Sequence, residues 1–259
     1  MKTFSKFAAA LRATIPVETV NMYTPVTIHH MHDMERLITS CGFMPFFNNA
    51  IPGFSIWENT PQELRFNDEV DGPWEWKGPV ILDGAFAYGK LLEGKAMYVT
   101  LDWYKHLVNW RRSHAHPSQQ ELRVLNTIAQ HGSLLTTELR KLRGYSRPRA
   151  KRENNPLLRE SQRLTQKLKP QPRIEGLETC LTRLQMGTYL VVADFEYKTD
   201  KTGRRYGWGV ARYCRPEDFF GPEALQAGCS PAESRDKIAR HLAENIPGID
   251  TRQIDAIIG

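Results

Sequence analysis

The residues with the clearest chemistry in this sequence are basic, and they are concentrated in one segment. Between Arg143 and Arg173 there are ten arginines and lysines against two acidic residues, so the segment carries a formal charge of +8, while the whole chain carries +6. A solvated protein surface mixes both signs of charge, whereas one-sided positive charge attracts phosphate groups. We predict that this segment contacts the phosphates of a nucleic acid. The side chains expected to do so are Arg147, Arg149, Lys151, Arg152, Arg159, Arg163 and Lys167.

Carboxylates are the candidates for acid–base chemistry. Asp83, Glu93 and Asp102 lie near an aromatic region, and any one of them could position a water molecule, but no two have the spacing of a catalytic pair. The sequence contains no G-x-G-x-x-G, Walker A, G-x-S-x-G or H-E-x-x-H motif. If the protein hydrolyses a bond, Asp83 is the residue that we expect to be catalytic.

Three histidines are the candidates for metal binding. His29, His30 and His32 lie close together, but no carboxylate or cysteine follows them at a ligand spacing. The interpretation as solvated histidines is therefore preferred, and we predict neither a metal nor another cofactor.

Aromatic residues fill the region from Phe43 to Val80, which reads as a long irregular loop. Its rings most simply pack over a core, and we prefer that interpretation. The alternative is that the rings form the wall of a pocket for a base or small ligand, because aromatic rings can stack on a ligand as well as pack in a core. The residues expected to line such a pocket are Trp74, Trp76, Tyr88 and Lys90.

The elements that would position these groups are clearest after residue 118. Helices are expected at 119–130 and 135–142, and a third from Leu177, where Leu177, Cys180 and Leu184 share one face. Gly187 ends that helix. Its opposite, mostly polar face is expected to contact DNA through Thr179, Thr182, Arg183 and Met186.

A hairpin with a basic tip is predicted next. Alternating residues from Tyr189 to Tyr197 form one strand, and residues 206–213 form the second. The tip is expected to meet the phosphate backbone through Lys198, Lys201, Arg204 and Arg205. The order of three helices, strand, turn and strand is that of a winged helix, in which the third helix can enter the major groove. We therefore expect an α+β fold that is mainly helical, although the same unit could instead serve only to pack or dimerise.

The rest of the chain is expected to flank this winged helix. We divide it into an N-terminal region of residues 1–117, the winged helix with its basic insert at 118–215 and a helical extension at 216–259. A hairpin at 86–100 followed by a helix at 102–112 indicates a second, degenerate winged-helix-like unit. The C-terminal extension is expected to form helices at 217–227, 231–244 and 251–257.

The cysteines and the apolar runs indicate the compartment. None of the four cysteines forms a C-x-x-C pair, which argues against a zinc ribbon and fits a reducing environment. The apolar run near the N-terminus is cut short by Arg12, so residues 4–11 are expected to form a docking helix and not a signal peptide. We expect a cytoplasmic protein without a membrane-spanning segment.

Three segments, Trp74–Lys90, Leu181–Lys198 and Gly203–Tyr213, resemble the AlkZ-related, AlkZ-like winged-helix proteins of bacteria. The resemblance covers about residues 35–231 and is closer to an uncharacterised branch of that family than to its true glycosylases. It implies tandem winged helices that contact DNA. The characterised members excise alkylated or crosslinked bases and hold the attacking water with a Gln-x-Gln or Gln-x-Asp pair. We expect that pair to be missing from this chain, so the resemblance implies the fold and DNA contact but not the reaction.

Taken together, these features predict a winged-helix protein that binds double-stranded DNA through its third helix, its wing and its basic insert. One alternative is a divergent DNA glycosylase that flips a damaged base into the aromatic region. A second is a non-catalytic interaction module, with homodimerisation as its function.

Overall fold

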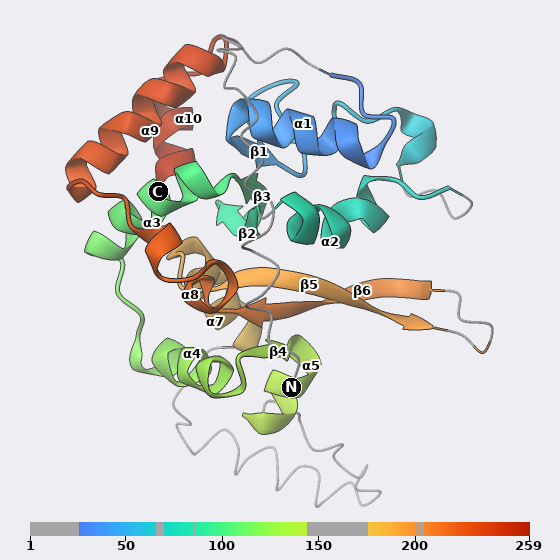
Figure 1. The fold of residues 1–259 in the computed structure, drawn as a ribbon, viewed down its shortest axis with the longest axis vertical. Helices are drawn as coiled ribbons and strands as arrows, with labels where there is room; N and C mark the ends of the chain where they lie inside the picture. The colour runs from blue at the N-terminus through green and yellow to red at the C-terminus, as the bar shows by residue number, and fades with distance from the viewer. Residues whose placement is uncertain (1–25, 66–69, 85, 144–175, 200, 202–204) are drawn as a thin grey trace, which may run out of the picture.

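A similar order of secondary-structure elements occurs twice along the chain, with a 3-10 turn in the first copy where the second has a helix (Figure 1). The computed structural model describes all residues except 1–25, 66–69, 85, 144–175, 200 and 202–204. We call residues 31–99 the first repeat and residues 119–214 the second repeat. Each repeat builds a three-stranded antiparallel sheet in which its last strand lies in the middle, and the fold is α+β as expected.

The first repeat contains the predicted hairpin. Its elements are α1 (Met31–Cys41), β1 (Phe43–Pro45), a 3-10 turn (Gln62–Leu64), α2 (Pro73–Gly84), β2 (Ala87–Leu92) and β3 (Lys95–Val99). The turn between β2 and β3 consists of Glu93 and Gly94, with φ angles of 46° and 74°. Two positive φ angles are what a two-residue hairpin turn needs to match the twist of its strands.

The interpretation of residues 43–80 as an irregular loop was wrong at both ends. Phe43–Pro45 pairs with β3, and Pro73 begins a helix that extends to Gly84. Proline is favoured at the first helical position, but a second proline, Pro79, lies inside the same helix. That interior proline, together with apolar residues on several sides of α2, hides the helical period in the sequence.

The second repeat follows its predicted order closely. Its elements are α4 (Gln119–His131), β4 (Ser133–Leu135), α5 (Thr136–Leu142), α7 (Leu177–Met186), β5 (Val191–Thr199) and β6 (Arg205–Cys214). The helices predicted at 119–130, at 135–142 and from Leu177 and the predicted hairpin are confirmed. The short strand β4 was not predicted, because three residues are too few to show a period of two.

The two repeats exchange contacts through equivalent elements. Helix α7 of the second repeat packs on β2 of the first, and helix α2 of the first packs on β5 of the second (Figure 1). The approach of α2 is close, because a Cβ at Gly78 would lie 3.2 Å from the Asp194 carboxylate. Their buried side chains therefore form one continuous hydrophobic core.

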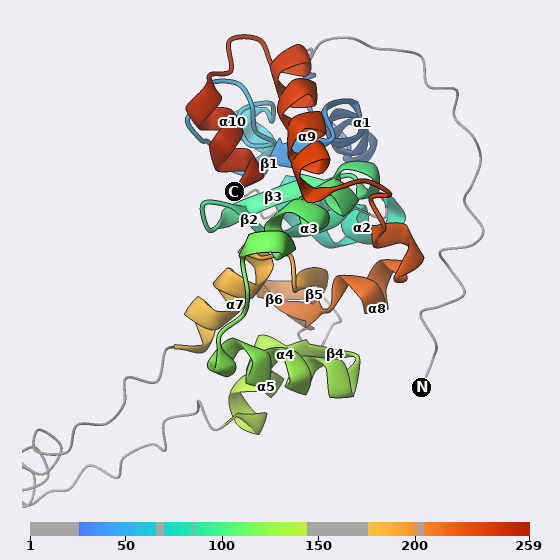
Figure 2. The same cartoon turned by 90° about the vertical axis from the view of Figure 1, so that its left-hand side faces the viewer.

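The remaining helices connect and cover the repeats. Helix α3 (Leu101–His114) joins them, and the C-terminal part forms α8 (Pro216–Phe220), a 3-10 turn (Glu223–Leu225), α9 (Pro231–Asn245) and α10 (Thr251–Ile258). Figure 2 shows the first-repeat sheet lying between α9 and α10 on one side and β5 and β6 on the other. The predicted helix at 217–227 is wrong beyond Phe220, because Gly221 and Pro222 interrupt it. The helix expected at 4–11 lies outside the described residues, and so does a helix that the sequence pattern predicts at 156–168 within the basic insert.

Within the described residues, no helix has the length and apolar character needed to cross a membrane.

Candidate nucleic-acid interface

The face of α7 that was expected to contact DNA is only partly available. Thr179, Arg183 and Met186 are exposed. Thr182 is half-buried, and its hydroxyl accepts a hydrogen bond from Lys90 Nζ at 3.1 Å. Beside it the buried Gln185 accepts the backbone N–H of Lys90 at 3.0 Å. The centre of the polar face of α7 therefore lies against the hairpin of the other repeat, so its exposed contact residues reduce to Thr179, Arg183 and Met186.

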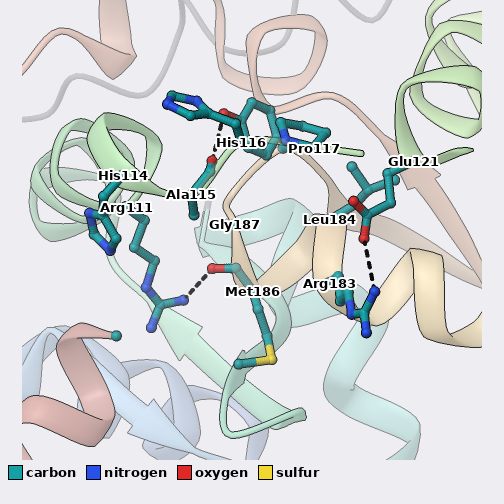
Figure 3. Close-up of a pocket in the computed structure, with 12 residues that line it drawn as sticks. Arg111, His114, Ala115, His116, Pro117, Glu121, Arg183, Leu184, Met186 and Gly187 are labelled. Carbon is teal, nitrogen blue, oxygen red and sulfur yellow. Dashed lines mark hydrogen bonds and ion pairs between the residues drawn. The ribbon is translucent and has the colours of Figure 1, made fainter. Parts of the chain in front are cut away.

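Two of these residues, Arg183 and Met186, also line a cavity (Figure 3). The cavity has a volume of about 320 Å³ and lies where the end of α3, the start of α4 and the end of α7 meet. Arg183 Nη1 lies 4.0 Å from Glu121 Oε1, and the carbonyl of Met186 accepts a hydrogen bond from Arg111. Glu121 is 5% exposed, and its other carboxylate oxygen caps α4 by accepting the N–H of Ser118. The sequence did not predict this cavity.

The β5–β6 hairpin extends beyond the other elements of the second repeat, and described basic residues lie near its tip (Figure 1). Lys198 and Lys201 are exposed. Glu196, nearer the base of the hairpin, forms an ion pair with Arg212 across the strands. Arg205 begins β6, but its side chain, like the whole of Arg204, lies outside the described residues.

The basic insert begins and ends at neighbouring points of the second repeat. Its predicted contact residues, from Arg147 to Lys167, lie outside the described residues. The chain leaves for the insert after α5 and returns at α7, and Arg140 on α5 forms an ion pair with Glu178 on α7 at 2.6 Å. The most basic segment of the sequence is therefore attached at both ends beside α7.

The predicted aromatic pocket residues pack in the joint between the repeats. Trp74 and Trp76 are half-buried on α2, and Tyr88 is 6% exposed. The Tyr88 ring lies 4.4 Å from that of Tyr98 and 5.8 Å from that of Phe195, and burial raises its pKa. Tyr88 therefore packs between rings of both repeats, and Trp74 and Trp76 pack against the hydrophobic core, which agrees with the preferred interpretation of these rings as packing residues. Neither they nor Lys90 line the cavity of Figure 3 or a second cavity of about 310 Å³ beside Gln253.

The predicted catalytic residue, Asp83, is exposed near the end of α2 and lines neither cavity. Its catalytic role stays a prediction.

A buried lysine in this joint escaped the sequence analysis. Lys77 on α2 is 2% exposed, and its Nζ lies 3.3 Å from the centre of the Trp74 ring, 4.3 Å from that of Phe195 and 6.0 Å from that of Tyr197. Aromatic faces attract a cation, most strongly where water is excluded. Trp74 and Lys77 are three residues apart, which is a helical spacing, but the signal was missed because this stretch was interpreted as a loop.

Lys77 is expected to make the stability of the protein rise with pH. Burial, opposed by the charge of Glu75, lowers the pKa of Lys77 to about 8, whereas an unfolded lysine has a pKa of about 10.4. Between these values the unfolded chain binds the proton and the folded chain does not, so the free energy of unfolding increases with pH, by at most about 3 kcal/mol. In urea unfolding, Lys77→Met should therefore be more stable than the wild type near pH 7, and the difference should shrink near pH 9.5.

The matched control is Lys95→Met, since Lys95 is exposed on β3 and should show no such pH dependence. A Lys77→Met protein that is less stable by the same amount at both pH values would contradict the prediction and show that the ring contacts outweigh the burial of the charge.

The expectation that the chain lacks a Gln-x-Asp triplet was wrong. Gln253, Ile254 and Asp255 form one in α10. Side chains two positions apart on an α-helix point about 200° apart, so they cannot converge on one water molecule. Gln253 Nε2 donates to the carbonyl of Ala50 at 2.9 Å, while Asp255 accepts from Arg235 at 2.7 Å. The triplet therefore has the sequence spacing of the family's catalytic pair, but its two side chains do not point in the same direction.

The three N-terminal histidines have ordinary surroundings. All are exposed, and His32 lies 3.4 Å from the carboxylate of Glu35. Across the described part of the chain, no three histidine, cysteine, aspartate or glutamate side chains are grouped so that they could hold a metal ion.

Comparison with known proteins identifies a family over most of the chain. The sequence model of a family described as AlkZ related matches residues 28–259, which include both repeats and the C-terminal helices. Neither the curated proteins nor the solved structures provided a match. The matched region includes all three segments on which the resemblance rested, and the chain belongs to the AlkZ-related family.

Proposed function

We propose that this protein binds double-stranded DNA, with the second repeat acting as a winged helix. Three things support the proposal: family membership, the order of elements and the location of basic residues. In a winged helix the short strand after the first helix joins the hairpin that follows the third. In both repeats the short strand pairs with the last strand of the hairpin, β1 with β3 and β4 with β6, although the first repeat has a 3-10 turn where the second has helix α5. The first repeat then contains the hairpin of the second unit that the sequence suggested, while the helix of that unit is α3, which joins the repeats.

One observation carries the proposal: the Arg140–Glu178 ion pair joins α5 and α7, the two helices between which the chain inserts a segment with a formal charge of +8. That segment is attached next to the exposed residues of α7, and Lys198 and Lys201 belong to the same repeat. Because Thr182 is engaged by Lys90, we assign most of the binding energy to phosphate contacts and little to base readout by α7.

We do not extend the proposal to cleavage of a glycosidic bond. Asp83 is exposed and lines neither described cavity, and the Gln253–Asp255 triplet cannot orient one water. Dimerisation through an apolar face is also not favoured. Of the exposed large apolar side chains in the described residues, Phe47, Val70, Leu82, Leu142 and Met186, only Met186 lies on α7 and none lies on the C-terminal helices.

The test is a titration of the protein into a short fluorescent DNA duplex at several salt concentrations. If about seven phosphates are neutralised, the logarithm of the association constant should fall with the logarithm of salt concentration with a slope of about −6. An affinity that does not change with salt would refute the proposal. A parallel series with a duplex carrying an alkylated purine, heated in alkali afterwards, would reveal abasic sites if the protein were a glycosylase.

A further inference from the structure

A cluster of polar side chains around a cysteine lies where α9 packs on α3, on the side of the molecule away from the hairpin tip (Figure 1). The Sγ atom of Cys229 is 3.3 Å from Ser234 Oγ and 3.8 Å from His106 Nδ1, and Ser234 Oγ is 3.0 Å from the same nitrogen. Asn109 Nδ2 lies 2.9 Å from Ser234 Oγ and 2.9 Å from the carbonyl oxygen of Cys229. A thiol, a hydroxyl and an imidazole are thus within reach of one another.

The direction of these hydrogen bonds follows from their partners. A carbonyl only accepts, so the Asn109 atom that contacts it must be the amide nitrogen, and that nitrogen also donates to Ser234 Oγ. Ser234 is fully buried and has one hydroxyl hydrogen. Its Oγ lies closer to His106 Nδ1, at 3.0 Å, than to Cys229 Sγ, at 3.3 Å, so we assign that hydrogen to the bond with His106. The Cys229 thiol then donates to Ser234 Oγ. The three groups form a path along which the proton of the thiol can pass through the hydroxyl to the imidazole.

The imidazole is in the form that can accept this proton. Burial lowers the pKa of His106, and the positive charges of Lys237 on α9 and Lys105 on α3 lower it further, while Asp102 on α3 raises it. His106 is therefore neutral near pH 7, as a general base must be.

Cys229 differs from the other cysteines in its access to solvent. It is partly exposed, whereas Cys41, Cys180 and Cys214 are buried. Burial raises the pKa of Cys41 to about 12 and also raises that of Cys214, which keeps both as unreactive thiols. Cys229 directly precedes Ser230, the N-cap of α9.

We propose that Cys229 is a nucleophilic thiol, activated through Ser234 by His106, and that it is a site of modification by low-molecular-weight disulfides. The Cys229 proton passes through the Ser234 hydroxyl to His106 Nδ1 as the sulfur attacks one sulfur of the disulfide. A new S–S bond forms, the old one breaks, and the departing thiolate takes the proton from the imidazolium. The exchange consumes one disulfide and releases one thiol, so no other oxidant is needed.

The test measures how fast glutathione disulfide modifies the full-length protein near pH 7, by intact mass and peptide mapping. The comparison protein is Cys229→Ser combined with Thr39→Cys, because Thr39 is exposed on α1 and its replacement supplies a surface thiol. Cys229 should react about tenfold faster than that thiol, and Cys229→Ser should abolish the adduct. Both His106→Gln and Ser234→Ala should lower the rate about tenfold and move the midpoint of its pH profile upward.

The proposal is wrong if Cys229 reacts no faster than the comparison thiol, or if neither relay variant changes its rate or pH profile. Unchanged circular dichroism of at least one relay variant ensures that a lower rate reports the relay. If His106→Gln does not fold, Ser234→Ala, which removes only one oxygen atom, decides the question.

Discussion

Replacing Arg147, Arg149, Lys151 and Arg152 by alanine is expected to weaken binding to duplex DNA by about 1,000-fold at 0.15 M salt. Each phosphate contact releases about 0.9 counterion, which corresponds to about 0.7 logarithmic unit of affinity at this salt concentration. The same loss should flatten the salt slope from about −6 to about −3. Titration of the fluorescent duplex at four or more salt concentrations measures both quantities. The four residues lie outside the described part of the chain, so the prediction rests on their charge and on the attachment of the segment beside α7.

A control must remove the same charge from another surface. The variant with alanine at Lys95, Lys237, Arg240 and Arg252 loses four positive charges from exposed positions on β3, α9 and α10. Both variants have a formal net charge of +2, since the wild type has +6. If affinity depended only on net charge, the two variants would bind equally, and the proposed role of the insert would be wrong. A nearly unchanged control beside a weakened insert variant would locate the contact.

Local patterns predicted those elements whose period was uninterrupted. The apolar stripe of Leu177, Cys180 and Leu184 placed α7 correctly, and alternation placed most of β5. Ser118, which accepts the N–H of Glu121, marks the start of α4 in the sequence as it does in the structure. Helix α2 was missed because Pro79 breaks the helical period, although neighbouring packing supports the helix in the folded protein.

The contacts that define the candidate interface join residues distant in the sequence, and no local pattern encodes them. Lys90 and Thr182 are 92 positions apart, yet their hydrogen bond decides which part of α7 is accessible. The contacts of Lys77 with aromatic rings could be recognised only after α2 was placed against β5. The sequence thus indicated the charged segment and its neighbouring helix and hairpin, whereas the packing between the repeats could be seen only in the structure.

Replacement of Arg111 by alanine is expected to lower the free energy of unfolding by about 3–5 kcal/mol. Its side chain is 3% exposed and donates to four carbonyls, those of Leu91, Met186, Ile257 and Ile258, at 2.7–2.8 Å. These belong to β2, to the last residue of α7 and to the end of α10, so one guanidinium joins both repeats to the C-terminal helices. The last carbonyls of a helix lack hydrogen-bond partners within the helix, and the negative end of the helix dipole also attracts a cation there. Alanine would leave buried carbonyls unpaired and a cavity in their place, which gives the expected magnitude.

Urea unfolding near pH 7 measures this loss, and two further variants test its cause. Arg123→Ala removes an exposed arginine from α4 and should change the free energy of unfolding by no more than about 0.5 kcal/mol. Arg111→Lys keeps the charge but not the planar set of donors, so it should recover less than half of the loss. Full recovery by lysine would show that charge alone matters, and a loss below about 1 kcal/mol in Arg111→Ala would mean that water satisfies the carbonyls. Because Arg111 holds the end of α7, the binding of Arg111→Ala to duplex DNA gives a further result. If the destabilised variant still binds with an unchanged salt slope, the binding energy comes from the insert and the wing and does not depend on how α7 is fixed.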